Sequence, residues 1–302
     1  PNGIGVSPTG QITTGDNEGT FVPRCPINWV TEDDFLGVVD SYENRDLLKT
    51  TATVEDRRIG RDTHLEPSEE PKPLAWLPKG VDNSGGGQGW VTSDKWGPFE
   101  GEMLHGSYGQ SSLYLVLKER IGTQMQGGVV KFPMRPTSSV MRLRFNERDG
   151  QLYISGLKGW QSNAGRNGGF DRLRFTGKPV AMPKGLNVTS KGLRLSFTQP
   201  LDPETANDAS SFSLRGSDIL WNQDYGTQEY LLGQRNLPIN DRKTGWSSFK
   251  IINATLLPDG QSVELTINDW QLAHMMELNI DLKTEKGQSI RTKINHTVHV
   301  IP

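Results

Sequence analysis

Apolar and polar residues alternate strictly in the C-terminal part of the chain. The clearest runs place apolar residues at every second position: Leu193, Leu195 and Phe197; Val263, Leu265 and Ile267; Leu278, Ile280 and Leu282. Successive side chains of a strand point to opposite faces, so this alternation predicts strands that bury one face. Turn sequences such as Pro258-Asp259-Gly260 separate the runs. The pattern predicts about seven antiparallel strands in an immunoglobulin-like β-sandwich. Its core is expected to contain Leu195, Phe197, Leu265 and Leu278.

Shorter strands separated by turns are predicted in the first half of the chain. Residues 3–14 and 141–154 share a strand–turn–strand pattern, with Thr9-Gly10-Gln11 and Asp149-Gly150-Gln151 at the turns. Further strands are expected at 102–106, 111–117 and 127–132. A repeated unit of this kind is typical of the blades of a β-propeller.

The composition divides the chain into two parts. Residues 1–177 are predicted to form propeller blades, and residues 178–302 the sandwich, with a short helical turn after Asp202. Residues 43–73 are charged and poor in large apolar side chains, which predicts a long surface excursion. The glycine-rich run 84–89 is predicted to be a flexible loop. The expected fold class is therefore all-β, with partial β-propeller blades followed by an immunoglobulin-like antiparallel β-sandwich.

The composition also excludes several classes of function. The 302 residues include 34 glycines, 18 prolines and 8 tryptophans, and the net charge is −2. No global charge favours nucleic acid, and no apolar run is long enough to span a membrane. Cys25 is the only cysteine, which excludes an intrachain disulfide and a covalent haem site. The sequence begins at Pro1 without a methionine, so we expect it to belong to a longer polypeptide.

Candidate binding residues lie mainly in the first half. Asp16-Asn17-Glu18 offers the oxygen ligands that suit Ca²⁺, although carboxylates that cap a turn have the same pattern. Trp96 and Trp160 are candidates for stacking on sugar rings, with packing between blades as the alternative, and Trp96 is expected to be exposed. His105 is a further substrate-binding candidate, with a hydrogen-bonded buried histidine as the alternative. Packing or surface roles are expected for His274, His296 and His299. The sequence has neither a nucleophile elbow nor a phosphate-binding loop, so catalytic residues stay unassigned.

Several runs within residues 1–175 carry a family resemblance. They are Asn2 to Gly10, Asp16 to Gly19, Pro26 to Val30, Gly101 to Leu104 with Ser107 to Gly109, and Arg142 ahead of Asp149 to Tyr153. In these runs the chain resembles the soluble quinoprotein sugar dehydrogenases, six-bladed propellers that oxidise sugars with pyrroloquinoline quinone and calcium. The junctions 156–161, 175–179 and 200–202 are similar to those of large secreted "membrane-bound dehydrogenase" or haem-binding proteins. Those proteins add a β-sandwich, and often a cytochrome c module, after the propeller.

The resemblance implies a quinone site that is reduced in this chain. Asn2 matches a family position that contacts the quinone. The family's Arg-x-Arg pair is matched by Val140 and Arg142 without a gap, or by Arg142 and Arg144 if two residues are deleted. Two cationic positions of the family are Pro1 and Gly109 here, and each lost charged hydrogen bond forfeits roughly 1.5–3 kcal/mol. Tight binding of the quinone by this chain alone is therefore not expected. The catalytic histidine of the family belongs to an earlier blade and has no counterpart.

Two functions are compatible with these observations. The first is part of a secreted or periplasmic carbohydrate or polyol oxidoreductase, with a cytochrome c as electron acceptor. The alternative is a non-catalytic module that binds glycan or a partner protein through Trp96, Trp160 and their loops. A blade takes about 40–50 residues, so residues 1–175 hold about three blades. The missing blades are expected on another chain or in an upstream segment. Strands around residues 3–14 and 151–157 are therefore expected to have an unpaired edge or to pair with a different polypeptide.

Overall fold

The computed structural model describes residues 2–20, 22–32, 34, 36, 72–221 and 225–302. Within them the chain forms antiparallel sheets and a few short helical turns, which confirms the all-β prediction. The surface excursion predicted for 43–73 lies outside the described residues, apart from residues 72 and 73. No helix in the described ranges is long and apolar enough to cross a membrane.

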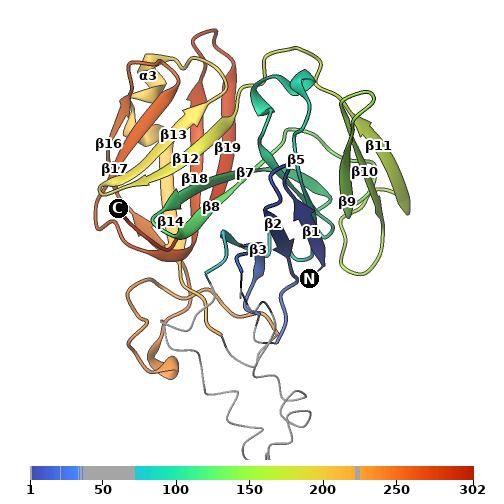
Figure 1. The fold of residues 1–302 in the computed structure, drawn as a ribbon. Helices are drawn as coiled ribbons and strands as arrows, with labels where there is room; N and C mark the ends of the chain where they lie inside the picture. Colours follow the sequence, from blue (N-terminus) through green and yellow to red (C-terminus); the bar gives the residue numbers. More distant parts are fainter. Residues whose placement is uncertain (1, 21, 33, 35, 37–71, 222–224) are drawn as a thin grey trace, which may run out of the picture.

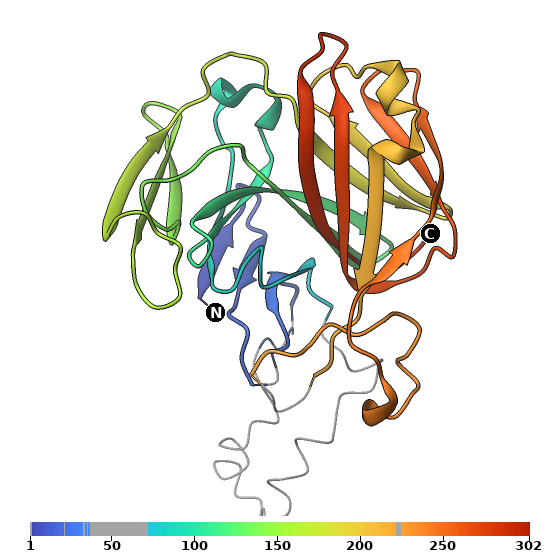
Figure 2. The ribbon, with the colours of Figure 1, turned by 180° about the vertical axis from the view of Figure 1, so that it is seen from behind.

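The first half of the chain forms three antiparallel meanders (Figures 1 and 2). The first meander consists of β1 (Gly3–Val6), β2 (Ile12–Gly15), β3 (Cys25–Trp29) and β4 (Ala75–Leu77). The second consists of β5 (Gly85–Trp90), β6 (Met103–Ser107), β7 (Ser112–Ile121) and β8 (Gln124–Lys131). The third consists of β9 (Arg142–Asn146), β10 (Gln151–Leu157) and β11 (Gly168–Leu173). Within the described residues these meanders do not close into a ring.

The glycine-rich strand β5 holds the three meanders together. A Cβ on Gly3 of β1 would lie 1.8 Å from the carbonyl oxygen of Gly86, and one on Gly86 would lie 2.2 Å from that of Val140. On the same strand the N–H of Gly87 donates to the carbonyl of Met141 (2.8 Å). The flexible loop predicted for residues 84–89 is therefore wrong. Glycine here serves the close approach of neighbouring backbones, a role that composition alone does not distinguish from flexibility.

Two further sheets face each other in the second half. One has the order β12 (Pro183–Thr189), β13 (Gly192–Phe197), β17 (Ser262–Ile267) and β16 (Ile251–Leu256). The other has the order β15 (Ser247–Phe249), β14 (Phe212–Ser217), β18 (Ala273–Lys283) and β19 (Ser289–Val298). The four residues predicted to be core are fully buried in one hydrophobic cluster: Leu195, Phe197, Leu265 and Leu278. The predicted helical turn is α3 (Pro203–Ala206), capped by Asp202.

Strand β19 also pairs with β8, and this pairing connects the two halves. Ile294 lies opposite Val130, and His296 lies opposite Gly128. A Cβ on Gly128 would lie 2.2 Å from the carbonyl oxygen of Asn295, so the close approach requires glycine. The result is one eight-stranded sheet that crosses the boundary predicted at residue 177.

The free sheet edges are only partly where the sequence predicts them. Strand β1 is an edge of the first meander, as predicted for residues 3–14. Residues 151–157 were also expected to have an unpaired edge, and this is wrong, because β10 pairs with β9 on one side and β11 on the other. The two edges of this sheet are β9 and β11, and the mixed Gly-Gly-Phe-Asp-Arg-Leu sequence of β11 carries little strand signal.

Candidate functional site

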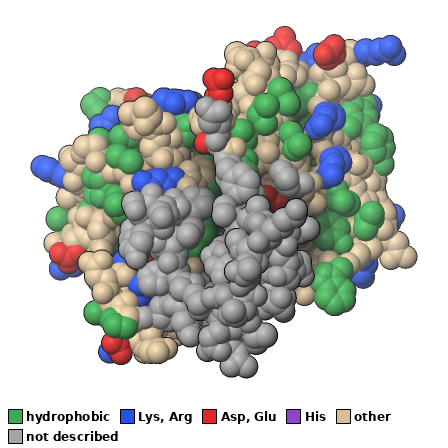
Figure 3. Space-filling view, turned by 60° about the horizontal axis from the view of Figure 1, so that its bottom comes forward, with side chains coloured by type: hydrophobic (Ala, Val, Ile, Leu, Met, Phe, Trp, Pro, Cys, Tyr) green, Lys and Arg blue, Asp and Glu red, His purple; other side chains and the backbone are tan. Residues whose placement is uncertain are grey.

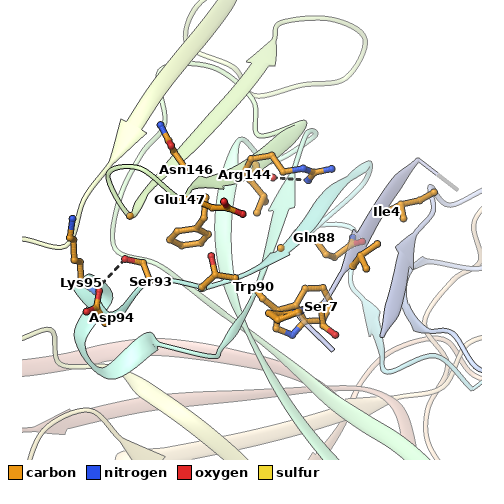
Figure 4. Close-up of a pocket in the computed structure, with 17 residues that line it drawn as sticks. Ile4, Ser7, Gln88, Trp90, Ser93, Asp94, Lys95, Arg144, Asn146 and Glu147 are labelled. Carbon is orange, nitrogen blue, oxygen red and sulfur yellow. Dashed lines mark hydrogen bonds between the residues drawn. The ribbon is translucent and has the colours of Figure 1, made fainter. Parts of the chain in front are cut away.

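An open cleft of about 680 Å³ lies where the first and third meanders flank β5 (Figure 4). Ile4 and Val6 of β1 are half exposed or more and form one wall. Gln88 and Trp90 of β5 line the cleft between its walls. Polar side chains from the other elements complete the lining: Ser7, Ser93, Asp94, Lys95, Arg144, Asn146 and Glu147.

The far wall is held by contacts between a short 3₁₀ helix and a turn. The helix is η1 (Asp94–Phe99), and the hydroxyl of Ser93 caps it by accepting from the N–H of Lys95 (3.3 Å). The Lys95 ammonium donates to the carbonyl of Asp149 in the β9–β10 turn (2.9 Å). In Figure 4, Asp94 and Lys95 lie at one end of the cleft and Ile4 at the other, with Arg144 and Glu147 between them. The four charged residues of this wall are all exposed: Asp94, Lys95, Arg144 and Glu147.

A second recess of about 410 Å³ continues from the cleft onto the outer face of the third meander. The two share Arg144, Phe145 and Asn146, and the recess adds Tyr153 and Phe170. The rings of Tyr153 and Phe170 lie 5.6 Å apart between centroids. Cleft and recess together offer charged, hydrogen-bonding and aromatic side chains on one continuous surface.

Beneath the cleft, a buried polar network fixes the second meander. The imidazole of His105 donates from Nε2 to Asp82 Oδ2 (2.7 Å), and the hydroxyl of Ser107 donates to Asp82 Oδ1 (2.6 Å). The amide of Gln88 donates to His105 Nδ1 (3.1 Å), which matches a neutral imidazole protonated at Nε2. All four side chains are almost inaccessible, with exposed fractions of 1% or less. His105 is therefore placed to orient Gln88 rather than to touch a ligand.

A second buried network lies in the C-terminal half. Asp218 Oδ1 is 3.1 Å from His274 Nδ1 and 2.7 Å from an Nη2 of Arg235. Burial works to raise the pKa of Asp218, but the hydrogen bonds from His274 and Arg235 outweigh it and lower that pKa to about 2.

On the face drawn in Figure 3 the described surface shows basic, acidic and apolar side chains but no histidine, in keeping with the burial of His105, His274 and His296.

Two of the predicted metal ligands have partners within the protein. The carbonyl end of the Asn17 side chain accepts from Asn2 Nδ2 (3.1 Å) and from the Ser84 hydroxyl (2.9 Å). Glu18 is buried and pairs with Arg24 (3.6 Å) and Lys79 (3.1 Å), so its carboxylate already has cationic partners. No group of three His, Cys, Asp or Glu side chains within the described ranges is arranged to hold a metal ion, and calcium binding by Asp16 to Glu18 stays a prediction.

The three predicted quinone contacts lie beside β5 or on β9. Asn2 donates to the carbonyl of Gly85 (2.6 Å) and does not line the cleft. Arg142 and Arg144 are exposed on β9, where each donates to the preceding carbonyl (2.8 Å). Arg144 lines the cleft and Arg142 does not. Quinone binding by these residues stays a prediction.

The two candidate tryptophans have opposite environments. The predicted exposure of Trp96 is wrong, because the side chain is 5% exposed and packs edge-on against Phe145 (5.0 Å between centroids). It sits on the inner side of η1, where an apolar ring contributes to the core. Trp160 is 85% exposed and lies beyond the end of β10. The sequence analysis missed Asp94, Glu147, Tyr153 and Phe170, and the alternation Tyr153-Ile154-Ser155 is the one signal that points to an outer face of β10.

Comparison of the chain with family models, curated proteins and solved structures gives no match.

Proposed function

We propose that this chain binds carbohydrate in the cleft between β1, β5 and β9. The observation that carries the proposal is the lining of the cleft. The carboxylates of Asp94 and Glu147 accept hydrogen bonds from sugar hydroxyls. The cationic groups of Lys95 and Arg144 and the amide of Asn146 donate hydrogen bonds to them. A cleft of about 680 Å³ has the size usual for small-molecule sites.

The buried polar groups support the frame of the cleft and do not reach a ligand in it. The histidines that have acidic partners, His105 and His274, are buried and hydrogen-bonded within the fold. The network around Asp82 instead fixes Gln88, a buried residue of β5 beneath the cleft.

The arrangement of the sheets supports a sector of a propeller as the frame of this site. The first strands β1, β5 and β9 lie against one another, as the inner strands of neighbouring blades do. Ile12 is exposed on the first meander, and Leu157 on the third. Further blades covering these two apolar side chains would complete a ring, and the two sheets of the second half would form the immunoglobulin-like module behind it. Both remain part of the proposal.

The oxidoreductase expected from the resemblance stays a prediction. It is tested by titrating the protein with pyrroloquinoline quinone and Ca²⁺ and following dye-linked oxidation of sugars. Because Pro1 and Gly109 replace two cationic positions of the family, we expect neither saturable quinone binding nor sugar oxidation by this chain alone.

Carbohydrate binding is tested by isothermal titration with a panel of soluble oligosaccharides. Thr92 is exposed and lines the cleft, so Thr92→Trp is expected to fill it and to weaken binding by at least about tenfold. Thr255→Trp is the matched control, because Thr255 is exposed on β16, away from the cleft. A protein that binds no member of the panel, or binds equally well as Thr92→Trp, would contradict the proposed function.

A further inference from the structure

The outer face of the third meander has a regular pattern of basic and aromatic side chains. In the antiparallel register, Tyr153 lies between Arg144 on β9 and Arg172 on β11. In the next row, Ser155 lies between Arg142 and Phe170. Residues directly opposite one another in a sheet point to the same side. Two rows of three residues therefore share this face, while Leu143, Leu152 and Ile154 point to the core.

The charges of this face are poorly compensated. Arg142, Arg144 and Arg172 are exposed, and within the described residues none of them forms an ion pair with a carboxylate. Asp149 is a nearby counter-charge. Its Oδ2 accepts a hydrogen bond from the Tyr153 hydroxyl (2.7 Å), and this bond is the main cause of the lowered pKa of Asp149. Most N–H groups of the three guanidinium groups are thus available to a ligand.

The segment that forms the third meander is more basic than the chain as a whole. Residues 142–173 contain six Lys and Arg and three Asp and Glu, a net charge of +3. The whole chain carries −2, so the other residues together carry −5. The third meander is therefore net positive, while the rest of the chain is net negative.

We propose that this face binds an acidic oligosaccharide, with carboxylate or sulfate groups on Arg142, Arg144 and Arg172 and a sugar ring on Phe170. The proposal rests on the proposed carbohydrate function and names the class of ligand. Guanidinium groups pair with carboxylate and sulfate through two parallel hydrogen bonds. Phe170 is 73% exposed, so its ring is open to a sugar face.

Continuity with the cleft favours a carbohydrate over a nucleic acid. The recess that contains Tyr153 and Phe170 shares Arg144 with the cleft, where Asp94 and Glu147 are exposed. Carboxylates accept from hydroxyl groups but repel phosphates spaced along a backbone. A ligand with many hydroxyls and a few acidic groups fits both surfaces, whereas a uniformly charged polyphosphate fits only one.

The test compares neutral and acidic oligosaccharides of equal length, such as cello-, oligogalacturonate and sulfated hexasaccharides, by isothermal titration. We expect the wild type to prefer an acidic oligosaccharide by at least about tenfold near 0.02 M salt, and the preference to shrink near 0.2 M salt. The combined variant Arg142→Gln, Arg144→Gln and Arg172→Gln should abolish the preference while retaining the thermal midpoint. The control combines Arg194→Gln, Arg215→Gln and Arg291→Gln, which removes the same charge from the sheets of the second half.

A second pair of variants tests the aromatic contact. Phe170→Ala is expected to weaken the acidic ligand several-fold without changing the salt dependence, and Tyr225→Ala, equally exposed outside the third meander, should have no effect. Equal binding of neutral and acidic oligosaccharides, or an unchanged preference in the triple variant, would overturn the acidic class and leave carbohydrate binding standing. Absence of all oligosaccharide binding would refute the proposed function itself. Binding of single-stranded DNA or inorganic polyphosphate as tight as that of the acidic sugar would show a general polyanion surface and also overturn the inference.

Discussion

At the scale of single residues, the buried histidines have two kinds of environment. His105 and His274 each contact an aspartate, whereas the Nδ1 and Nε2 atoms of His296 have no hydrogen-bond partner within the described structure. The sequence predicts packing or surface roles for His274 and His296, and it makes His105 a substrate-binding candidate with a buried hydrogen-bonded histidine as the alternative. It does not predict the partners, because Asp82 and Asp218 lie far from them along the chain and reach them only through the register of the sheets.

Replacing His296 with leucine should stabilise the protein. A buried polar group without a partner costs about 1–3 kcal/mol, and His296→Leu is expected to recover that amount near pH 7. Urea denaturation measures the difference. His299→Leu is the control, since His299 Nε2 donates to the carbonyl of Pro73 (2.8 Å) and its loss removes a satisfied contact.

The same substitution should change the pH dependence of stability. Burial lowers the pKa of His296 to about 3, whereas the unfolded side chain takes up a proton near pH 6.5. The unfolded state thus binds more protons between these values, so the free energy of unfolding falls with acidification by up to about 1.4 kcal/mol per pH unit. His296→Leu should show a shallower fall between about pH 6 and pH 4. Parallel curves for the two proteins would mean that His296 is hydrated in solution.

At the scale of elements, the alternation of apolar and polar residues predicts a strand correctly only where the strand buries one face. Strands β13, β17 and β18 bury one face, and their apolar residues are found where the pattern predicts them. Strand β5 contains Gly-Gly-Gly-Gln-Gly, and no period of side chains exists to be read. The candidate site was therefore predicted in part: Arg144 was identified, but the strand that supports the cleft was not.

A methyl group on Gly86 should disrupt the contact between meanders. The added Cβ of Gly86→Ala would lie 2.2 Å from a backbone oxygen of Val140, which cannot turn away as a side chain could. We expect a loss of about 1–3 kcal/mol or more in the free energy of unfolding. Gly80→Ala is the matched control, because a Cβ there meets nothing within 4 Å. Equal stability of the two variants in chemical denaturation would contradict the close packing at β5.

At the scale of the whole molecule, the shared eight-stranded sheet is the feature that sequence analysis did not predict. Both β8 and β19 have ordinary strand sequences, and Gly128 carries no sign that another backbone passes beside it. Pairing partners far apart in the chain are set by the packing of both halves together. Periodicity reports which face of a strand is buried, and it does not report the neighbouring strand.

The shared sheet predicts that both halves unfold together. Calorimetry of the whole chain should give one transition whose calorimetric and van't Hoff enthalpies agree. The reason is that opening β19 from β8 would expose the backbone of the middle of one sheet. Two resolved transitions in calorimetry would show that the halves unfold independently despite the pairing. Near-ultraviolet circular dichroism would then show part of the signal lost at the lower temperature.

The separation of charge between the third meander and the remaining residues gives the molecule an electric dipole moment. A +3 segment beside a −5 remainder experiences a torque in any external field, even though the net charge is only −2. Near a negatively charged matrix, the protein would be rotated before contact so that β9, β10 and β11 (Figure 1) lead the approach. Encounters would then be productive in a larger fraction of collisions, and the association rate would depend on ionic strength more steeply than the net charge alone implies.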